Sequence, residues 1–446
     1  MGSTRIFVLG FLAIILLGTL LLMLPISSAD GEPTNPLNAA FTAVSATCVT
    51  GLTVVDTATH WSMFGQIVIL LMIQVGGLGF MTLAVMLSLL IRRSVTPRER
   101  MLVAMSYNLG SYDSTLVLVR RILIGTVCME GVGALLLSIR FIPDFGLANG
   151  IYKSIFHSVS AFCNAGFDII GIGNPNISGM GYYVGDYLVN VTLALLIIFG
   201  GIGFLVWSDM INFTRSGKRL SVYSKFVLII TAVLLVSGTV FFAVFEWSNP
   251  LTLGALDSIP KKILASFFQS TTWRTAGFAM IDNAAFTQNS QLLGILLMFI
   301  GGASGSTAGG VKVGTIGIVV YTVWCITMGK KNAVVFRRTI PEGSFVRATA
   351  VIIVQLSVAV LGVLIMLSTT PFGTMDVLYE SVSAIGTVGV SLGITPLLPG
   401  AGKVTLMFLM YFGRIGVLTF TYALMNSLSS ESSSSIKYPD AKMPIG

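Results

Sequence analysis

The chain has 446 residues, of which 54% are hydrophobic and only 10% are charged, and its formal net charge is +8. Soluble domains carry about 25% charged residues, so this composition excludes an ordinary soluble protein and indicates an integral membrane protein. The positive charge does not indicate nucleic-acid binding, because more than half of the 26 Lys and Arg residues lie in short connections between apolar stretches.

Eight stretches are long and apolar enough to cross a hydrocarbon core of about 30 Å as helices. Five of them hold no charge, and the other three hold one each, namely Glu130, Lys312 and Arg414. In chain order the predicted spans are 6–24, 64–91, 122–139, 188–207, 226–245, 292–328, 348–368 and 404–425.

The basic residues predict how these spans are oriented. They are concentrated in the connections 92–121, 215–225 and 330–347, whereas the segment 28–66 holds no Lys or Arg. Because cytoplasmic loops carry the excess of Lys and Arg, we expect these connections and both termini in the cytoplasm.

A short pattern recurs four times between the spans. An aromatic residue is followed by Ser or Thr four positions later and by glycine ten positions later, and successive glycines are 115, 111 and 112 residues apart. This regular spacing predicts four copies of one unit around a central axis. The aromatic and glycine pairs are Phe41 and Gly51, Phe156 and Gly166, Phe267 and Gly277, and Tyr379 and Gly389.

Each copy is predicted to contain an outer helix (M1), a re-entrant pore segment (P) and an inner helix (M2). The predicted fold is therefore an all-α integral membrane protein with eight transmembrane helices, four pore loops and pseudo-fourfold symmetry, as in a potassium channel. Irregular backbone at membrane depth is tolerated where it lines a cavity. The expected repeats are 1–95, 116–213, 224–328 with a broken inner helix, and 346–428, followed by a polar tail at 429–446.

The residues around the four glycines are the predicted ion filter. A pore must replace the water that a cation loses, and backbone carbonyls can do so if they all turn inward. Glycine supplies the left-handed conformation that this requires at little cost. The alternative is that these glycines only allow close packing. The candidate filter residues are Val49-Thr50-Gly51, Asn164-Ala165-Gly166, Thr275-Ala276-Gly277 and Thr387-Val388-Gly389.

The inner span of the third repeat contains ten consecutive small residues. Each glycine costs a helix about 1 kcal/mol relative to alanine, so we expect a broken helix whose loop lies in the cavity below the filter. Close packing of helices through small residues is the alternative. The run is Gly301-Gly302-Ala303-Ser304-Gly305-Ser306-Thr307-Ala308-Gly309-Gly310.

Arg414 occupies the place where the other inner helices have glycine. A charge at mid-membrane depth usually faces a cavity or a partner. It is interpreted either as an electrostatic barrier that acts with the loop, or as one half of an ion pair with Glu130. Lys312 either reaches the cytoplasmic interface or adds to the barrier. Arg274 is expected to support the filter from behind, because a cation in the ion path would repel the substrate.

Three acidic residues follow filter glycines on the outer side, namely Asp56, Asp168 and Asp282. They either concentrate cations at the pore mouth or are solvated loop residues. His157, directly after one of the repeat aromatics, is interpreted as a helix residue.

Enzymatic motifs are missing from the sequence. It has no Walker loop, no dinucleotide-binding glycine pattern after a strand and no nucleophile–base set. The four cysteines do not have the spacing of a metal site. We therefore expect no enzyme and no cofactor in this chain.

With these features, the chain resembles the membrane subunits of the Ktr/Trk/HKT superfamily of potassium transporters, most closely those of the KtrB type. The resemblance covers nearly the whole length and implies a bacterial plasma-membrane protein with Gly51, Gly166, Gly277 and Gly389 as a potassium filter. It also implies that the intramembrane loop is the gate. Further implications are a homodimer and a cytosolic, nucleotide-binding regulatory ring of the KtrA type, so that any nucleotide lies on the partner.

Three functions are compared. The first is a gated conduit for potassium driven by the membrane potential, which supplies about 2.3 kcal/mol per charge per 100 mV. The second is a sodium- or proton-coupled symporter, which the few buried ionisable residues disfavour. The third is a membrane scaffold, which has no need for four glycines in equal register.

Overall fold

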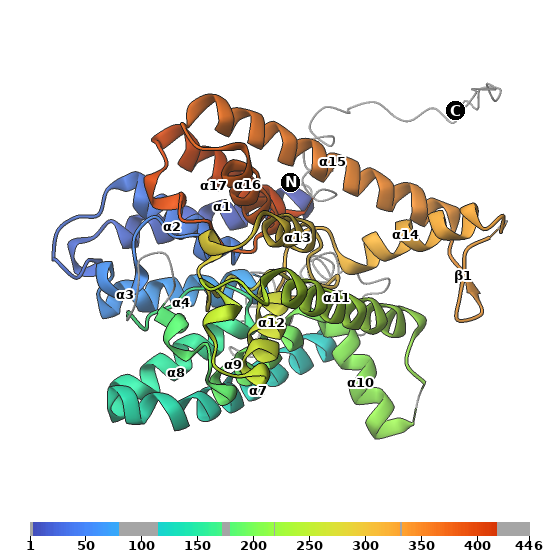
Figure 1. Ribbon diagram of the computed structural model, residues 1–446, viewed down its shortest axis with the longest axis horizontal. Coiled ribbons are helices and arrows are strands. Elements are labelled where there is room, and N and C mark those ends of the chain that lie inside the picture. The colour runs from blue at the N-terminus through green and yellow to red at the C-terminus, as the bar shows by residue number, and fades with distance from the viewer. Residues whose placement is uncertain (1–2, 80–114, 172–178, 218, 331, 417–446) are drawn as a thin grey trace.

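The computed structural model describes residues 3–79, 115–171, 179–217, 219–330 and 332–416 (Figure 1). Several predictions lie outside these residues. They are the second half of the first inner span, the end of the last one, the basic residues at 92–100 and the polar tail 429–446.

Helices make up almost all regular structure among the described residues. The first half of the chain contains α1 (Ser3–Leu22), α2 (Pro36–Cys48), α3 (Thr57–His60), α4 (Met63–Leu78), α7 (Thr115–Phe145), α8 (Leu147–Phe162), α9 (Tyr187–Gly201) and α10 (Phe204–Ser216). The second half contains α11 (Val222–Glu246), α12 (Ile259–Thr272), α13 (Gln288–Phe299), α14 (Val313–Thr327), α15 (Glu342–Thr369), α16 (Thr374–Gly386) and α17 (Gly400–Ile415). The strands β1 (Val334–Val335) and β2 (Arg338–Thr339) form a short antiparallel hairpin between α14 and α15.

Within the described residues, three helices are long and apolar enough to cross a membrane alone, namely α7, α11 and α15. Helices α9 and α10 pass the same test together, although the chain bends by 98° between them. The apolar parts of α1, α4 and α14 are shorter. Figure 1 shows α7 and α15 along opposite edges of the molecule. The chain is thus a helical membrane protein, and the count of eight spans stays a prediction.

Four short helices, α2, α8, α12 and α16, occupy the positions of the predicted pore segments. They have 13, 16, 14 and 13 residues, and at 1.5 Å per residue none can cross the hydrocarbon core. Each packs against the long or apolar helix that precedes it, in the pairs α1–α2, α7–α8, α11–α12 and α15–α16. Their second halves are almost completely buried, which places all four C-terminal ends in the interior.

The predicted span 188–207 is not one continuous helix, so the second repeat has a break in addition to the one expected in the third. Helix α9 ends at Gly201, and Gly203 has a φ of 92°, a conformation that side-chain-bearing residues rarely adopt. Helices α4 and α17 likewise end just before Gly79 and Gly416, whose φ angles are 78° and 85°. A glycine in the left-handed region therefore stops three inner helices at corresponding places.

Candidate ion filter and gate

The segments that follow α2, α8, α12 and α16 share one backbone pattern. Each begins with a non-glycine residue in the left-handed region, continues with a residue of negative φ and reaches the motif glycine, again with positive φ. Alternating handedness turns consecutive carbonyl groups toward the same side of a chain, as a carbonyl-lined filter requires. The φ angles are 58° and 96° at Val49 and Gly51, 60° and 67° at Asn164 and Gly166, 68° and 82° at Thr275 and Gly277, and 50° and 95° at Thr387 and Gly389.

The four glycines lie close enough to touch one another's segments. A methyl group added to Gly166 would lie 2.6 Å from the Cα atom of Gly277, and one added to Gly277 would lie 3.0 Å from the Cα atom of Gly166. Each added methyl group would also meet the carbonyl oxygen before the glycine of the next segment, in a closed cycle. These contacts run from Gly51 to Ala165, from Gly166 to Ala276, from Gly277 to Val388 and from Gly389 to Thr50.

Hydroxyl groups at the ends of the short helices hold the segments. The Gly51 and Gly389 N–H groups each donate to a serine hydroxyl, Ser45 or Ser383, over 3.1 Å. In the third repeat the bond to the segment comes from Thr272, which donates to the Phe278 carbonyl over 2.7 Å. Thr271, the residue that matched the pattern, instead donates to Phe267 within its own helix. These bonds explain why the pattern contains Ser or Thr. In the third repeat the residue that makes the bond, Thr272, stands one position after the residue that matched the pattern.

The run of small residues is a loop between α13 and α14, and it contacts the inner ends of the filter segments. A bridge between Ile300 and Val311 closes the base of the loop. The Thr307 hydroxyl donates to the Phe162 carbonyl over 3.1 Å and lies 3.3 Å from Oδ1 of Asn164. Hence the loop packs directly against the second filter segment.

The same loop completes the break between α9 and α10. The Ala303 N–H donates to the Gly201 carbonyl over 2.8 Å, and the Phe204 N–H donates to the Gly305 carbonyl over 2.9 Å. The Thr307 N–H adds a bond of 3.2 Å to the Gly200 carbonyl. The loop therefore satisfies backbone groups that the kink leaves without helical partners.

Arg414, at the end of α17, joins the loop to another inner helix. Its guanidinium donates to the carbonyls of Thr307, Gly76 and Gly77, the last over 3.2 Å. The carboxylate of Glu130 accepts from Gln74 over 3.3 Å. This arrangement favours the contact of Arg414 with the loop over the alternative of an ion pair with Glu130. The C-terminal carbonyls of α4 also attract a cation through the helix dipole.

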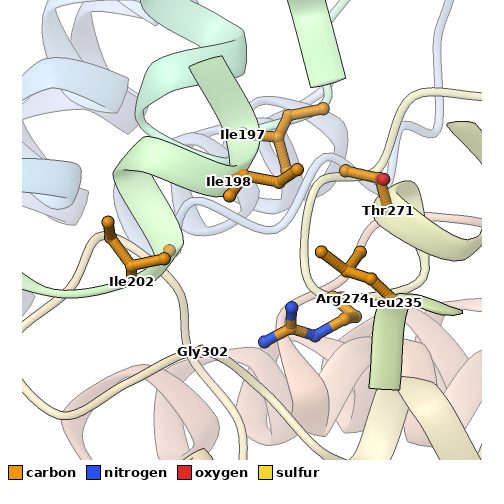
Figure 2. Close-up of a pocket in the computed structure, with 8 residues that line it drawn as sticks. Ile197, Ile198, Ile202, Leu235, Thr271, Arg274 and Gly302 are labelled. Carbon is orange, nitrogen blue, oxygen red and sulfur yellow. The ribbon is translucent and has the colours of Figure 1, made fainter. Parts of the chain in front are cut away.

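Lys312 and Arg274 lie beside the loop. The ammonium group of Lys312 donates to the Ala308 carbonyl over 2.6 Å, so it folds back on the loop and does not reach for the interface. Figure 2 shows Arg274 pointing toward Gly302 in a cavity of about 10 Å³. Ile197 and Ile198 of α9, and Ile202 just after that helix, also line the cavity. Within the described part of the chain, Nε of Arg274 has no hydrogen-bond partner. The expectation that Arg274 supports the filter from behind stays a prediction.

The three outer acids differ from one another. Asp56 is exposed and caps α3, and Asp282 caps the short helix Asn283–Ala285. The Asp168 side chain is only 8% exposed and forms an ion pair with His157. Asp168 is therefore neither a solvated loop residue nor an open charge at the mouth. No group of three or more His, Cys, Asp or Glu among the described residues has the arrangement of a metal site.

Comparison with known proteins agrees with the fold and the resemblance. The TrkH family model, described as a cation transport protein, matches residues 4–436. Ktr system potassium uptake protein B of Bacillus subtilis (strain 168) is 40% identical over 444 residues, covering 99% of this chain and 96% of that protein. Potassium/sodium uptake protein NtpJ of Enterococcus hirae is 38% identical over 450 residues, covering 100% of this chain and 98% of that protein.

A solved structure shows the same fold. The crystal structure of the potassium transporter TrkH from Vibrio parahaemolyticus matches with a TM-score of 0.72 at 18% identity, over 93% of this chain and 84% of that one. The full-length relatives are transport proteins, which confirms the expectation that this chain is not an enzyme. With the family model spanning nearly its whole length, the chain belongs to the TrkH family of cation transport proteins.

Proposed function

We propose that this protein takes up potassium across the bacterial plasma membrane through a filter built from four glycines. The observation that carries the proposal is the closed cycle of contacts between each motif glycine and the carbonyl of the next segment. In this proposal, four M1–P–M2 repeats with eight membrane spans surround the filter, and both termini lie in the cytoplasm. Two full-length relatives are named for potassium uptake, which supports the choice of ion.

The filter acts through its backbone. Carbonyls of the residues 49–51, 164–166, 275–277 and 387–389 replace the hydration shell of the ion. The first repeat keeps Gly51, whereas the resemblance associates serine at this place with a preference for sodium. We therefore assign a preference for potassium over sodium.

The gate consists of the loop 302–310 together with Arg414. The loop lies against the inner ends of the filter segments, and the guanidinium that holds it is a positive charge on the ion path. A cation can pass only when the loop and Arg414 move aside. A cytosolic, nucleotide-binding regulatory ring drives this movement, acting on a homodimer of the chain. The word "system" in the name of the Bacillus relative supports a partner.

Coupling to sodium is the second candidate. It is favoured by one observation, the name "Potassium/sodium uptake protein" of the Enterococcus relative. In a coupled mechanism, potassium uptake requires an inward sodium gradient. In the conduit it requires only a membrane potential.

The test measures uptake of Rb⁺ and Na⁺ into liposomes that contain the purified chain, with an imposed negative-inside potential. Parallel samples contain a chain that lacks residues 304–308. We expect Rb⁺ uptake that needs only the potential, exceeds Na⁺ uptake and rises in the deletion variant. Uptake that requires a sodium or proton gradient supports the symporter. Absence of Rb⁺ uptake in both forms contradicts the proposal.

A further inference from the structure

A buried ion pair lies behind the second filter segment. His157 follows the motif aromatic on α8 and is completely buried, and Asp168 stands two residues after Gly166. Nε2 of His157 lies 2.8 Å from Oδ1 of Asp168. The pair therefore connects α8 to the outer end of the filter segment that follows this helix.

The hydrogen bonds of His157 fix the orientation of its ring. Nδ1 of His157 lies 2.7 Å from the Lys153 carbonyl, which can only accept, so Nδ1 carries a proton. Nε2 faces the carboxylate of Asp168 at 2.8 Å. The Ile169 N–H also points at Nε2, but over a longer distance of 3.3 Å. The contact with the carboxylate is the shorter of the two and links the imidazole to Asp168.

The carboxylate is well satisfied in this position. Burial alone would raise the pKa of Asp168, but hydrogen bonds from His157 and from the N–H groups of Ile170 and Met180 outweigh it, so the pKa lies below its usual value. These two backbone bonds measure 2.8 Å and 3.0 Å. The carboxylate thus binds three separate parts of the chain around the filter mouth.

Lys153 is the other charged group that faces this region. Its ammonium donates to the carbonyls of Ile169 and Ile170, over 2.7 Å and 3.0 Å. Aromatic rings of Phe141 from α7 and Phe278 from the third filter segment cover the imidazole, with ring centroids at 5.6 Å and 6.4 Å. The pair is therefore enclosed by apolar groups, where a charged hydrogen bond is strong and its loss is costly.

The other repeats have different residues at the two positions that correspond to His157 and Asp168. These positions are the residue after the motif aromatic and the residue two places after the filter glycine. Only in the fourth repeat is one of them ionisable, where buried Glu380 accepts from Thr395. The remaining pairs of positions are Thr42 and Thr53, Phe268 and Ala279, and Glu380 and Ser391. The ion pair is a feature of one quarter of the filter.

We propose that the His157–Asp168 pair is a positioning element that holds the outer half of the second filter segment and thereby sets discrimination between K⁺ and Na⁺. This inference rests on the proposed function of the four glycines as a filter. A stiff filter favours the larger ion because its carbonyls are prevented from closing around the smaller one. The His157–Asp168 pair provides that resistance, because it holds the backbone two residues after Gly166 and does not touch the ion.

The test compares Asp168→Asn, His157→Gln and the double variant with the unsubstituted full-length chain in liposomes. The readouts are the ratio of Rb⁺ to Na⁺ uptake and the thermal stability of the purified protein. Asp56→Asn is the matched control, because it removes an exposed outer acid whose side chain accepts hydrogen bonds from Ala58 and Thr59 in α3. Asp168→Glu restores the charge and tests for rescue.

We expect the Rb⁺/Na⁺ ratio to fall about tenfold in both single variants, which corresponds to about 1.4 kcal/mol of differential ion binding. The double variant should be no worse than the poorer single variant, because both substitutions break one interaction. Asp56→Asn should keep the ratio of the unsubstituted chain, and Asp168→Glu should recover part of it.

Several outcomes overturn the inference. Unchanged ratios in Asp168→Asn and His157→Gln contradict it, and so does an equal loss in Asp56→Asn, which would indicate a long-range charge effect. If thermal stability falls while the Rb⁺/Na⁺ uptake ratio is unchanged, the pair contributes to folding alone. The same conclusion follows if both variants fail to accumulate. Lack of Rb⁺ uptake by the unsubstituted chain contradicts the proposed function itself, and that result is distinguishable from all the others.

Discussion

Replacing Gly277 by alanine separates the steric demand of the filter from ordinary backbone strain. Gly277 has a φ of 82°, and an added methyl group would lie 2.6 Å from the Val388 carbonyl oxygen. Carbon–oxygen contacts rarely fall below about 3.3 Å, so the two segments must separate by roughly 0.7 Å. Gly146 has a φ of 80° with nothing within 4 Å of an added methyl group, which makes Gly146→Ala the matched control.

Both substitutions should cost about 1–2 kcal/mol of stability through backbone strain, because alanine is strained in the left-handed region. Gly277→Ala adds the cost of its contact with the Val388 carbonyl. Only Gly277→Ala should impair uptake. An ion that loses one well-placed carbonyl loses an interaction of about 1.5–3 kcal/mol, which lowers its occupancy roughly ten- to hundredfold. Rb⁺ uptake into liposomes and thermal unfolding measure the two effects. Gly277→Ala protein that transports Rb⁺ like the control would refute the reasoning.

The remaining predictions concern the gate. Arg414→Gln removes charge-assisted bonds of about 1.5–3 kcal/mol to the Thr307 and Gly76 carbonyls. Rb⁺ uptake by the chain alone should therefore rise at least about tenfold. An unchanged uptake rate contradicts the role of Arg414 in the gate. Thr307→Val keeps the shape but loses the bond to the Phe162 carbonyl, worth about 0.5–1.5 kcal/mol, and should raise uptake about two- to tenfold in the same assay. Deletion of 304–308 should raise uptake more than either substitution, and a smaller rise would place the barrier outside the loop.

The convergence of the four glycine segments could be predicted from sequence because its signal is repetition. The four glycines recur at nearly constant spacing, and a requirement for left-handed backbone selects glycine at each site. The second left-handed position could not be found in the same way. Val49, Asn164, Thr275 and Thr387 share no side-chain property, and valine is ill-suited to positive φ. Tertiary packing at the ends of the pore helices imposes that conformation.

The kink between α9 and α10 was missed for a related reason. The run Gly200-Gly201-Ile202-Gly203 is apolar and reads as part of a span. It breaks because a loop about a hundred residues further along the chain supplies the hydrogen bonds that the helix gives up. Similarly, the charge of Arg414 stood out in an apolar stretch, but its partners are backbone carbonyls, which every residue possesses. Sequence locates such a charge without revealing what it binds.

These contacts indicate how strongly the gate is held. Three backbone bonds join the loop to α9 and α10, each worth about 1 kcal/mol net, and Arg414 adds a charge-assisted bond. Displacing the loop therefore costs on the order of 5 kcal/mol. One charge moved across the whole membrane gains only about 2.3 kcal/mol at 100 mV. Shifting a two-state element from 1:99 to 99:1 takes about 5.5 kcal/mol of differential binding. The chain alone therefore opens rarely and keeps a low basal uptake, and the binding energy of a partner raises the open fraction. The membrane potential drives the ion once the loop has moved.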